Sequence, residues 1–214
     1  MTGIPPNYPN YELDGKTRLI LAGEQLFAEN GINGASMREI ATRAEQGNHA
    51  AVQYHFGSRE GLVRAIFDFR MEKMEASRSK MLKQAEVEGR LRDARTILDI
   101  ILIPQLDMQD ADGNHSYANF LSQYLLLSSS REFSDFAGPE TPSLTEALRL
   151  LSERVNYLPQ HVAQRRLISV SLMFLNILIR HQDQSENVLG ESISEALEDT
   201  MEQIVNVMCM PHRR

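Results

Sequence analysis

Residues 36–56, SMREIATRAEQGNHAAVQYHF, carry the local signals of two short helices joined by a turn. Ser36 and Glu39 have the spacing of a capping box, in which each side chain accepts a hydrogen bond from the backbone amide of the other residue. Gly47 lies in the predicted turn, and Asn48 is placed to cap the second helix. Two short helices joined in this way predict a helix-turn-helix.

A supporting helix is predicted directly before this stretch. It starts at Asp14, carries apolar residues at intervals of three and four, and ends near Gly31, which suits the left-handed conformation after a helix. The apolar face comprises Leu19, Ala22, Gly23, Leu26 and Phe27. Beyond the helix-turn-helix, Ser58 can cap a long fourth helix that continues towards Glu88.

Helical patterns continue from there to the C-terminus, and no pattern of period two, typical of strands, occurs. Residues 97–103 are apolar on nearly every side, which predicts a helix in the middle of a bundle, and Pro104 should kink it. Residues 144–158 form another helical pattern, and the last two helices are expected at 160–181 and at about 187–210.

We therefore predict an all-α fold of about nine helices. Residues 1–13, rich in proline and asparagine, are expected to be a disordered tail, although an arm that contacts a groove of DNA is an alternative. Residues 14–62 should form a three-helix helix-turn-helix domain that binds DNA. Residues 63–214 should form a larger helical bundle for ligand binding and dimerisation.

The overall charge does not favour a nucleic-acid partner. The chain has 22 basic and 29 acidic residues, a net charge of −7, and residues 1–60 contain five basic and seven acidic residues. Any DNA binding must therefore depend on a few well-placed cations and on helix N-termini, and salt should weaken it strongly. The single cysteine, Cys209, argues against a disulfide or a zinc site. Because we find no apolar run near the roughly 20 residues of a membrane span, we expect a cytoplasmic protein.

The third helix is the candidate for reading base pairs. If Val52 and Phe56 face the core, then Ala50, Gln53 and Tyr54 face outward. Gln53 can form a paired hydrogen bond with an adenine edge, the small alanine permits close approach, and Tyr54 can reach phosphate oxygens. The other readings are that Gln53 is merely solvated and that Tyr54 packs its ring against neighbouring helices.

Further contacts are expected around this helix. His55 can reach a phosphate, unless it is a partly buried core histidine, and Arg43 is interpreted as a surface charge. The start of the second helix and Arg59, at the start of the fourth, can hold phosphates. The full set of candidate DNA-binding residues is Ser36, Met37, Arg38, Asn48, His49, Ala50, Gln53, Tyr54, His55 and Arg59.

Three ordered blocks carry a resemblance to a known family. They are residues 26–31 (LFAENG), 36–41 (SMREIA) and 50–62 (AAVQYHFGSREGL). Together they closely resemble the N-terminal signature of the TetR family of transcriptional regulators over about residues 16–67. The turn at 45–47 is one residue longer than the common pattern of that family.

The resemblance implies a cytoplasmic homodimer that binds a double-stranded DNA operator and a small-molecule effector. Repression is implied more than activation. The last two helices are candidates for the dimer interface, through Phe174, Ile177, Ile193, Leu197, Met201 and Ile204, although packing in the core is an equal alternative. A pocket for a mostly apolar ligand is expected along Ile101, Gln105, Tyr117, Phe120, Tyr124 and Met173.

Two other classes of function are weighed against this one. We find no nucleophile elbow, phosphate-binding glycine loop or pair of histidines with metal-ligand spacing, so we expect no catalytic residues, cofactor or metal. The second alternative is a helical protein-interaction module that does not read DNA, which the acidic N-terminal third of the chain would suit. Steep weakening of DNA binding by salt distinguishes the regulator from this module.

Overall fold

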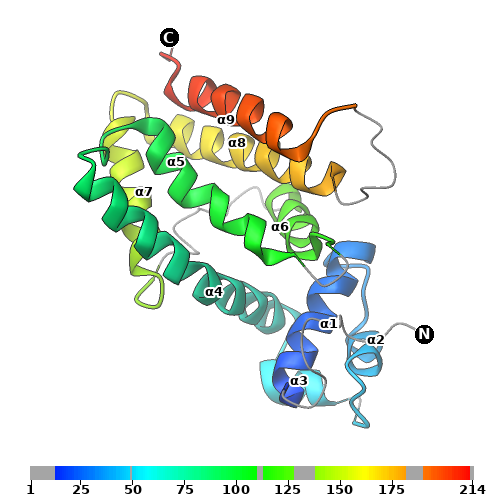
Figure 1. Ribbon diagram of the computed structural model, residues 1–214. Helices are drawn as coiled ribbons and strands as arrows, with labels where there is room; N and C mark the ends of the chain where they lie inside the picture. The colour runs from blue at the N-terminus through cyan, green and yellow to red at the C-terminus, as the bar shows by residue number, and fades with distance from the viewer. Residues whose placement is uncertain (1–12, 49, 110–112, 128–137, 182–189, 213–214) are drawn as a thin grey trace. The chain divides into compact units, whose positions relative to one another are not determined.

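The computed structural model describes residues 13–48, 50–109, 113–127, 138–181 and 190–212. Over these residues the chain forms nine α-helices and one 3-10 helix and no strand, which confirms the predicted all-α fold (Figure 1). Of the expected tail at 1–13, only Leu13 lies within the described residues. The helices are α1 (Gly15–Asn30), α2 (Met37–Arg43), α3 (Ala51–Phe56), α4 (Arg59–Val87), α5 (Ala94–Leu102), η1 (Ile103–Met108), α6 (Ser116–Leu127), α7 (Pro142–Arg154), α8 (Gln160–Arg180) and α9 (Ile193–Cys209).

The chain divides into two compact units. The first comprises Met1–Arg70 and Met108–Ser128, and the second comprises Met71–Asp107 and Ser129–Arg214. Helix α4 contributes its first part to one unit and its remainder to the other. The first unit is larger than the domain predicted at 14–62, because α6 packs against α1 and belongs with it.

The predicted caps define the ends of the N-terminal helices. The Asp14 carboxylate accepts a 2.7 Å hydrogen bond from the Thr17 amide at the start of α1. Gly31, with φ of 76°, ends this helix in the left-handed region. At the start of α4, the Ser58 hydroxyl oxygen accepts a hydrogen bond of 3.1 Å from the Gly61 amide. The roles of Gly31 and Ser58 were therefore predicted correctly from the sequence, whereas Asp14 was predicted only as the start of the helix.

An aromatic cluster and a buried ion pair hold the first unit together. The ring of Phe67, on α4, lies 5.0 Å from Phe120 and 4.6 Å from Tyr124, both on α6. Phe120 also stacks on Phe27 of α1, at 6.1 Å between ring centroids. Beside this cluster, the Arg70 guanidinium contacts the Glu24 carboxylate through two hydrogen bonds of 2.6 Å each. Helices α1, α4 and α6 therefore share one core.

The second unit is a helical bundle in which α5 contacts both α7 and α9, and α8 packs along α9. The apolar helix α5 is buried as predicted, and from Ile103, the residue before Pro104, the chain continues as the 3-10 helix η1. Proline lacks the amide that an α-helix needs at this point, which explains the change.

Two helix boundaries in this unit differ from the prediction. Helix α7 ends at Arg154, so Val155 and Leu158 lie in the turn that follows. Helix α9 begins at Ile193, and the expected start near residue 187 lies outside the described residues. The start at Ile193 has a local cause, because Ser192 and Glu195 form a capping box that the sequence analysis did not recognise.

The prediction that no segment approaches the length of a membrane span is wrong for helix α8. By length and composition, it is the one helix in the described part of the chain that is long and apolar enough to cross a membrane. Its apolar side chains nevertheless have an explanation inside the second unit, where Val162, Val170 and Phe174 are almost completely buried. A core helix of a bundle has the same composition.

Candidate nucleic-acid interface

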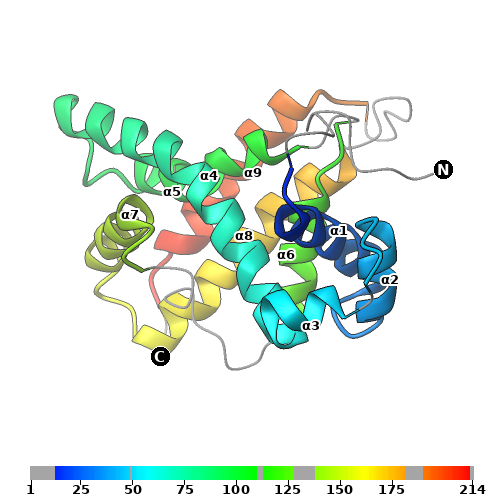
Figure 2. The same cartoon turned by 90° about the horizontal axis from the view of Figure 1, so that it is seen from below.

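Helices α1, α2 and α3 form the candidate interface. Helix α2 contacts both α1 and α3, and the view in Figure 2 shows the three helices next to one another. Helix α2 begins with the predicted capping box: the Glu39 amide donates to the Ser36 hydroxyl at 3.1 Å, and the Ser36 amide donates to the Glu39 carboxylate at 2.8 Å. The second of these bonds lowers the pKa of Glu39, because the donated hydrogen bond favours the charged carboxylate.

The turn between α2 and α3 contains a strained residue. Glu45 has φ of 55°, in the left-handed region, and it is the one residue other than glycine with a positive φ among those described. Its amide donates to the Thr42 carbonyl at 3.1 Å, and the Gln46 amide donates to the Ala41 carbonyl at 2.9 Å. These two bonds form a Schellman motif, in which glycine is the usual residue at the position of Glu45.

Helix α3 starts later than the sequence predicted. The Asn48 side chain accepts a 2.9 Å hydrogen bond from the Ala50 amide, so it shapes the turn. Ala50 is the N-cap residue and provides no capping side chain, and the helix begins at Ala51. The candidate residue His49 lies outside the described residues. Asn48 and Ala50 are both exposed.

One face of α3 is buried and the opposite face points to solvent. Ala51 and Val52 are buried, whereas Gln53 and His55 are exposed and Tyr54 is 84% exposed. The rings of Tyr54 and His55 lie edge to face, with their centroids 5.0 Å apart. The alternatives in which Tyr54 packs against other helices or His55 lies in the core are therefore wrong. Three neighbouring polar side chains form an accessible edge on α3.

Cations near α3 are few. Lys16 and Arg38 are exposed, and neither forms an ion pair within the described part of the chain. Arg43 forms a 2.6 Å ion pair with Glu29, which agrees with its interpretation as a surface charge. Ser36 is exposed and Met37 is half-buried at the start of α2. The positive charge beside α3 is thus local and small.

Arg59 has backbone partners that the sequence did not indicate. Its guanidinium donates to the backbone carbonyls of Ile32 and Ala35, the latter at 2.6 Å, and lies 5.9 Å from the ring centroid of Phe27. It therefore ties the start of α4 to the loop between α1 and α2. Both hydrogen bonds are donated by Nη1, so backbone carbonyls hold this nitrogen, and a contact between Arg59 and a phosphate stays a prediction.

Two glycines fix the corner between α3 and α4. Gly57 follows α3 with φ of 70°. A Cβ atom on Gly61 would lie 1.9 Å from the carbonyl oxygen of Phe56, so only glycine permits this approach. Gly61 was not among the residues predicted to position α3. Its signal was the closeness of two glycines on either side of a cap.

The predicted ligand-pocket residues are divided between the two units. Tyr117, Phe120 and Tyr124 are buried in the aromatic cluster of the first unit. In the second unit, Ile101 and Gln105 are buried and Met173 is half-buried. The amide oxygen of Gln105 has no hydrogen-bond partner among the described residues.

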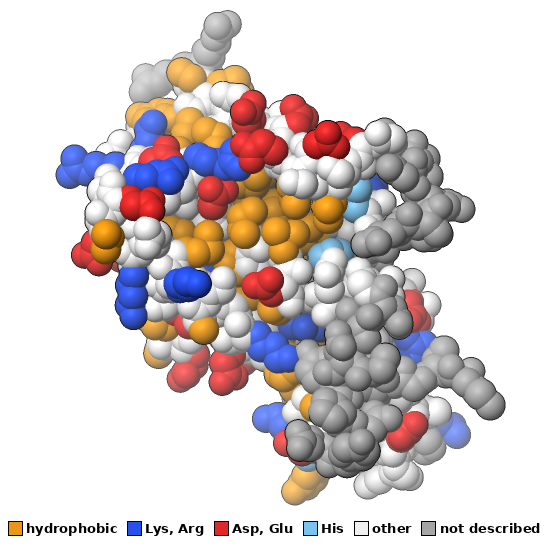
Figure 3. All heavy atoms as spheres, in the orientation of Figure 1, with side chains coloured by type: hydrophobic (Ala, Val, Ile, Leu, Met, Phe, Trp, Pro, Cys, Tyr) orange, Lys and Arg blue, Asp and Glu red, His pale blue; other side chains and the backbone are white. Residues whose placement is uncertain are grey.

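The candidate dimer residues fall into two classes. Phe174, Met201 and Ile204 are buried inside the protomer, so they belong to its core and are unavailable to a partner. Ile177, Ile193 and Leu197 are half-buried and keep some exposed surface. Figure 3 shows apolar side chains gathered on one face of the second unit, next to a row of acidic side chains along α9.

Comparison with known proteins agrees with this geometry. Residues 19–66 match the family model described as bacterial regulatory proteins of the tetR family. No curated protein matches the chain. The matched residues include α2, α3 and the corner with α4, and so they contain the exposed edge of α3 described above. No group of three histidine, cysteine or acidic residues that could hold a metal occurs in the part of the chain that the structure describes. Over residues 19–66 the chain therefore carries the N-terminal DNA-binding domain of the TetR family of transcriptional regulators.

Proposed function

We propose that the protein is a cytoplasmic repressor that binds a palindromic operator as a homodimer and releases it when a small ligand binds the second unit. The observation that carries this proposal is the exposed polar edge of α3, in a helix whose opposite face is buried. In a helix-turn-helix, this geometry suits insertion of the second helix into the major groove.

The side chains on the edge of α3 have complementary tasks. Gln53 can donate to and accept from the major-groove edge of an adenine, which discriminates between base pairs. Tyr54 and His55 can donate to phosphate oxygens, which sets the register of the helix on the duplex. Ala50 is exposed and small, so it permits close approach of the backbone to the groove.

Contacts with the DNA backbone are proposed at the start of α2. Arg38 is exposed there, and Ser36 and Met37 lie beside it. Lys16, at the start of α1, adds a second exposed cation. Because the chain has a net charge of −7, these few contacts must work against an unfavourable overall charge. We expect affinity to fall steeply as salt is raised.

The dimer is proposed to form through α8 and α9. Both helices keep half-buried apolar side chains on their surfaces, including Ile177 and Leu197. The exposed charges of the two helices are complementary, because α8 presents Arg165 and Arg180 and α9 presents Glu202 and Asp199. In an isologous interface, α8 of one protomer can face α9 of the other. Two α3 helices about 34–36 Å apart would then reach successive major grooves.

Gel-shift titration tests the role of α3. An operator is first selected from random duplexes with the wild-type protein at low salt. We expect Gln53→Ala combined with Tyr54→Ala to lower affinity for this operator by at least about tenfold, the cost of losing one paired base contact. The control combines Gln84→Ala with Tyr157→Ala, both exposed residues of the second unit, and should bind as wild type does. Retained binding by the α3 variant would overturn the proposal.

A further inference from the structure

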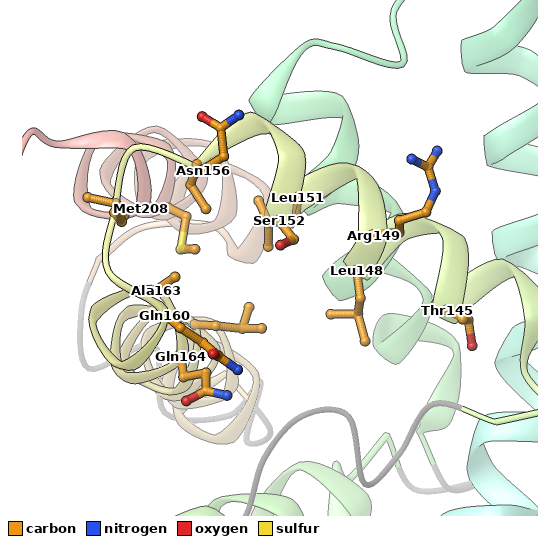
Figure 4. Close-up of a pocket in the computed structure, with 13 residues that line it drawn as sticks. Thr145, Leu148, Arg149, Leu151, Ser152, Asn156, Gln160, Ala163, Gln164 and Met208 are labelled. Carbon is orange, nitrogen blue, oxygen red and sulfur yellow. The ribbon is translucent and has the colours of Figure 1, made fainter.

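A cavity of about 640 Å³ lies between α7, α8 and the end of α9 in the second unit (Figure 4). None of the six residues predicted to line a ligand pocket contributes to it. Its volume is within the range of about 300–1,000 Å³ that is typical of small-molecule sites. We refer to it as the α7–α8 groove.

The floor of the α7–α8 groove is apolar. It consists of five almost completely buried side chains, Leu151, Val155, Leu158, Leu167 and Met208. Half-buried Leu148 and Ala163 line its walls. In Figure 4, Leu148 points from α7 into the gap between the two helices. Such a floor gains free energy when it is covered by an apolar group.

The rim of the groove is polar but uncharged, with one exception. Its hydroxyl and amide groups belong to Thr145, Ser152, Asn156, Gln160 and Gln164. Gln160 and Gln164 are one turn apart on α8, so their amides lie on the same side of the helix. Figure 4 shows them on the wall opposite Leu148. They can donate and accept hydrogen bonds at one end of a ligand.

The exception is Arg149, whose charge is already neutralised. Its Nε and Nη2 donate to the Glu146 carboxylate at 2.8 and 2.6 Å, and its Nη1 donates to Glu153. Arg149 also extends away from the gap in Figure 4. Neither an anionic nor a cationic ligand would therefore find an unpaired charge of opposite sign among the residues that line the groove. Burying either charge without a partner is costly.

We propose that the α7–α8 groove binds an uncharged amphiphile, with its apolar body on the floor and its hydroxyl or carbonyl group at the two glutamines. This inference rests on the proposed function, because it assigns the ligand that controls DNA release to this groove. The groove contains none of the six residues that the sequence predicted to line the ligand pocket.

The groove is connected to both helices of the proposed dimer interface. Arg166 lies between Gln164 and Leu167 on α8, and its guanidinium donates to the carbonyls of Met208, at 3.2 Å, and Met210. Arg166 thus joins the wall of the groove to the end of α9, where Met208 forms part of the floor. A ligand that separates α7 from α8 would displace α8 and α9 together.

A dye-displacement titration on the full-length protein tests the ligand class. The uncharged dye Nile red is bound to the protein and then displaced with 1-octanol, octanoate or octylammonium, which share one apolar chain. We expect octanol to displace the dye at a concentration at least about tenfold lower than either ion, because each ion loses its solvation without gaining a partner. Equal displacement by octanoate or octylammonium, or no dye binding at all, would overturn the proposal.

Three variants locate the site. Leu148→Trp fills the gap and should abolish displaceable dye, whereas Val87→Trp, at an 84% exposed position on α4, should leave it unchanged. Gln160→Ala combined with Gln164→Ala keeps the apolar floor of the groove. It should weaken the binding of octanol roughly tenfold, because hydrogen bonds to the ligand are lost. Circular dichroism confirms that each variant is folded. Displaceable dye in folded Leu148→Trp would place the site elsewhere and contradict the proposal.

DNA binding is measured separately, without dye or alcohol. If the protein binds octanol at the groove but selects no operator, the proposed repressor function is wrong, whereas the assignment of the groove as a ligand site still holds. If the operator is bound but octanol neither occupies the groove nor releases the DNA, the groove assignment fails alone.

Discussion

The guanidinium of Arg70 and the carboxylate of Glu24 form a bidentate ion pair, with two hydrogen bonds of 2.6 Å, in the interior of the first unit. Arg70 is 4% exposed and Glu24 is 1% exposed. The Ser116 hydroxyl donates a further 2.5 Å hydrogen bond to the same carboxylate. The pair thus connects α4 to α1 and α6, on which the position of the helix-turn-helix depends.

Removing one member of this pair should destabilise the first unit strongly. Arg70→Met leaves the Glu24 carboxylate buried without its cation, and we expect the free energy of unfolding to fall by roughly 3–5 kcal/mol. Chemical denaturation measures this free energy of unfolding. The double variant Glu24→Leu with Arg70→Met should lose less stability than Arg70→Met alone, because no unpaired charge is left in the interior. A single-variant loss below about 1 kcal/mol would mean that the pair is solvated.

Relieving the backbone strain at Glu45 should stabilise the protein. Glu45→Gly places glycine at φ of 55°, where side chains are disfavoured, and should raise the free energy of unfolding by up to about 1 kcal/mol. The matched control is Glu45→Ala, which retains a Cβ atom and should unfold as wild type does. An equal gain in both variants would point to the charge of Glu45 as the cause.

A methyl group at Gly61 should displace α3. In Gly61→Ala the Cβ atom would lie 1.9 Å from the Phe56 carbonyl oxygen, so the corner between α3 and α4 must open. We expect a loss of about 1–3 kcal/mol in stability, as for other forced overpacking, together with weaker operator binding. Gly47→Ala is the control, because its Cβ atom would meet no atom within 4 Å. Operator affinity in Gly61→Ala equal to that of Gly47→Ala would contradict this role.

The capping box of α2 should make stability depend on pH. The Ser36 amide donates to Glu39 and lowers its folded-state pKa below the ordinary value of 4.5. The charged form of Glu39 therefore stabilises the fold above about pH 4.5, and this contribution is lost as pH falls through the lowered pKa.

Glu39→Gln keeps a capping side chain without the charge. In thermal unfolding we expect its Tm to lie below that of wild type at pH 7 and to approach it at pH 3. A difference in Tm that stays constant between pH 7 and pH 3 would show that the charge of Glu39 contributes nothing.

The sequence predicted the features that depend on neighbours along the chain. The capping box at Ser36 and Glu39, the end of α1 at Gly31 and the burial of Val52 on α3 all follow from local spacing, and the structure has each of them. Gln53 and Tyr54 were placed outward by the same helical periodicity, and they are exposed.

Features set by contacts distant in sequence were not predicted. Arg59 has the composition of a phosphate-binding residue, yet the carbonyls of Ile32 and Ala35, more than twenty residues earlier, hold its guanidinium. Phe174 and Met201 have the spacing of an interface, yet they pack inside the protomer. A stripe of apolar residues shows that a helix face is covered but not which helix covers it.

The most direct test of the account compares the operator sequences selected by wild type and by Gln53→Ala from random duplexes at one salt concentration. If α3 reads base edges, wild type should select two inverted half-sites about one helical turn apart, and Gln53→Ala should lose its preference at one base pair in each half-site while keeping the others. An unchanged base preference in Gln53→Ala, or no selected sequence with wild type, would contradict the claim that this edge of α3 recognises DNA.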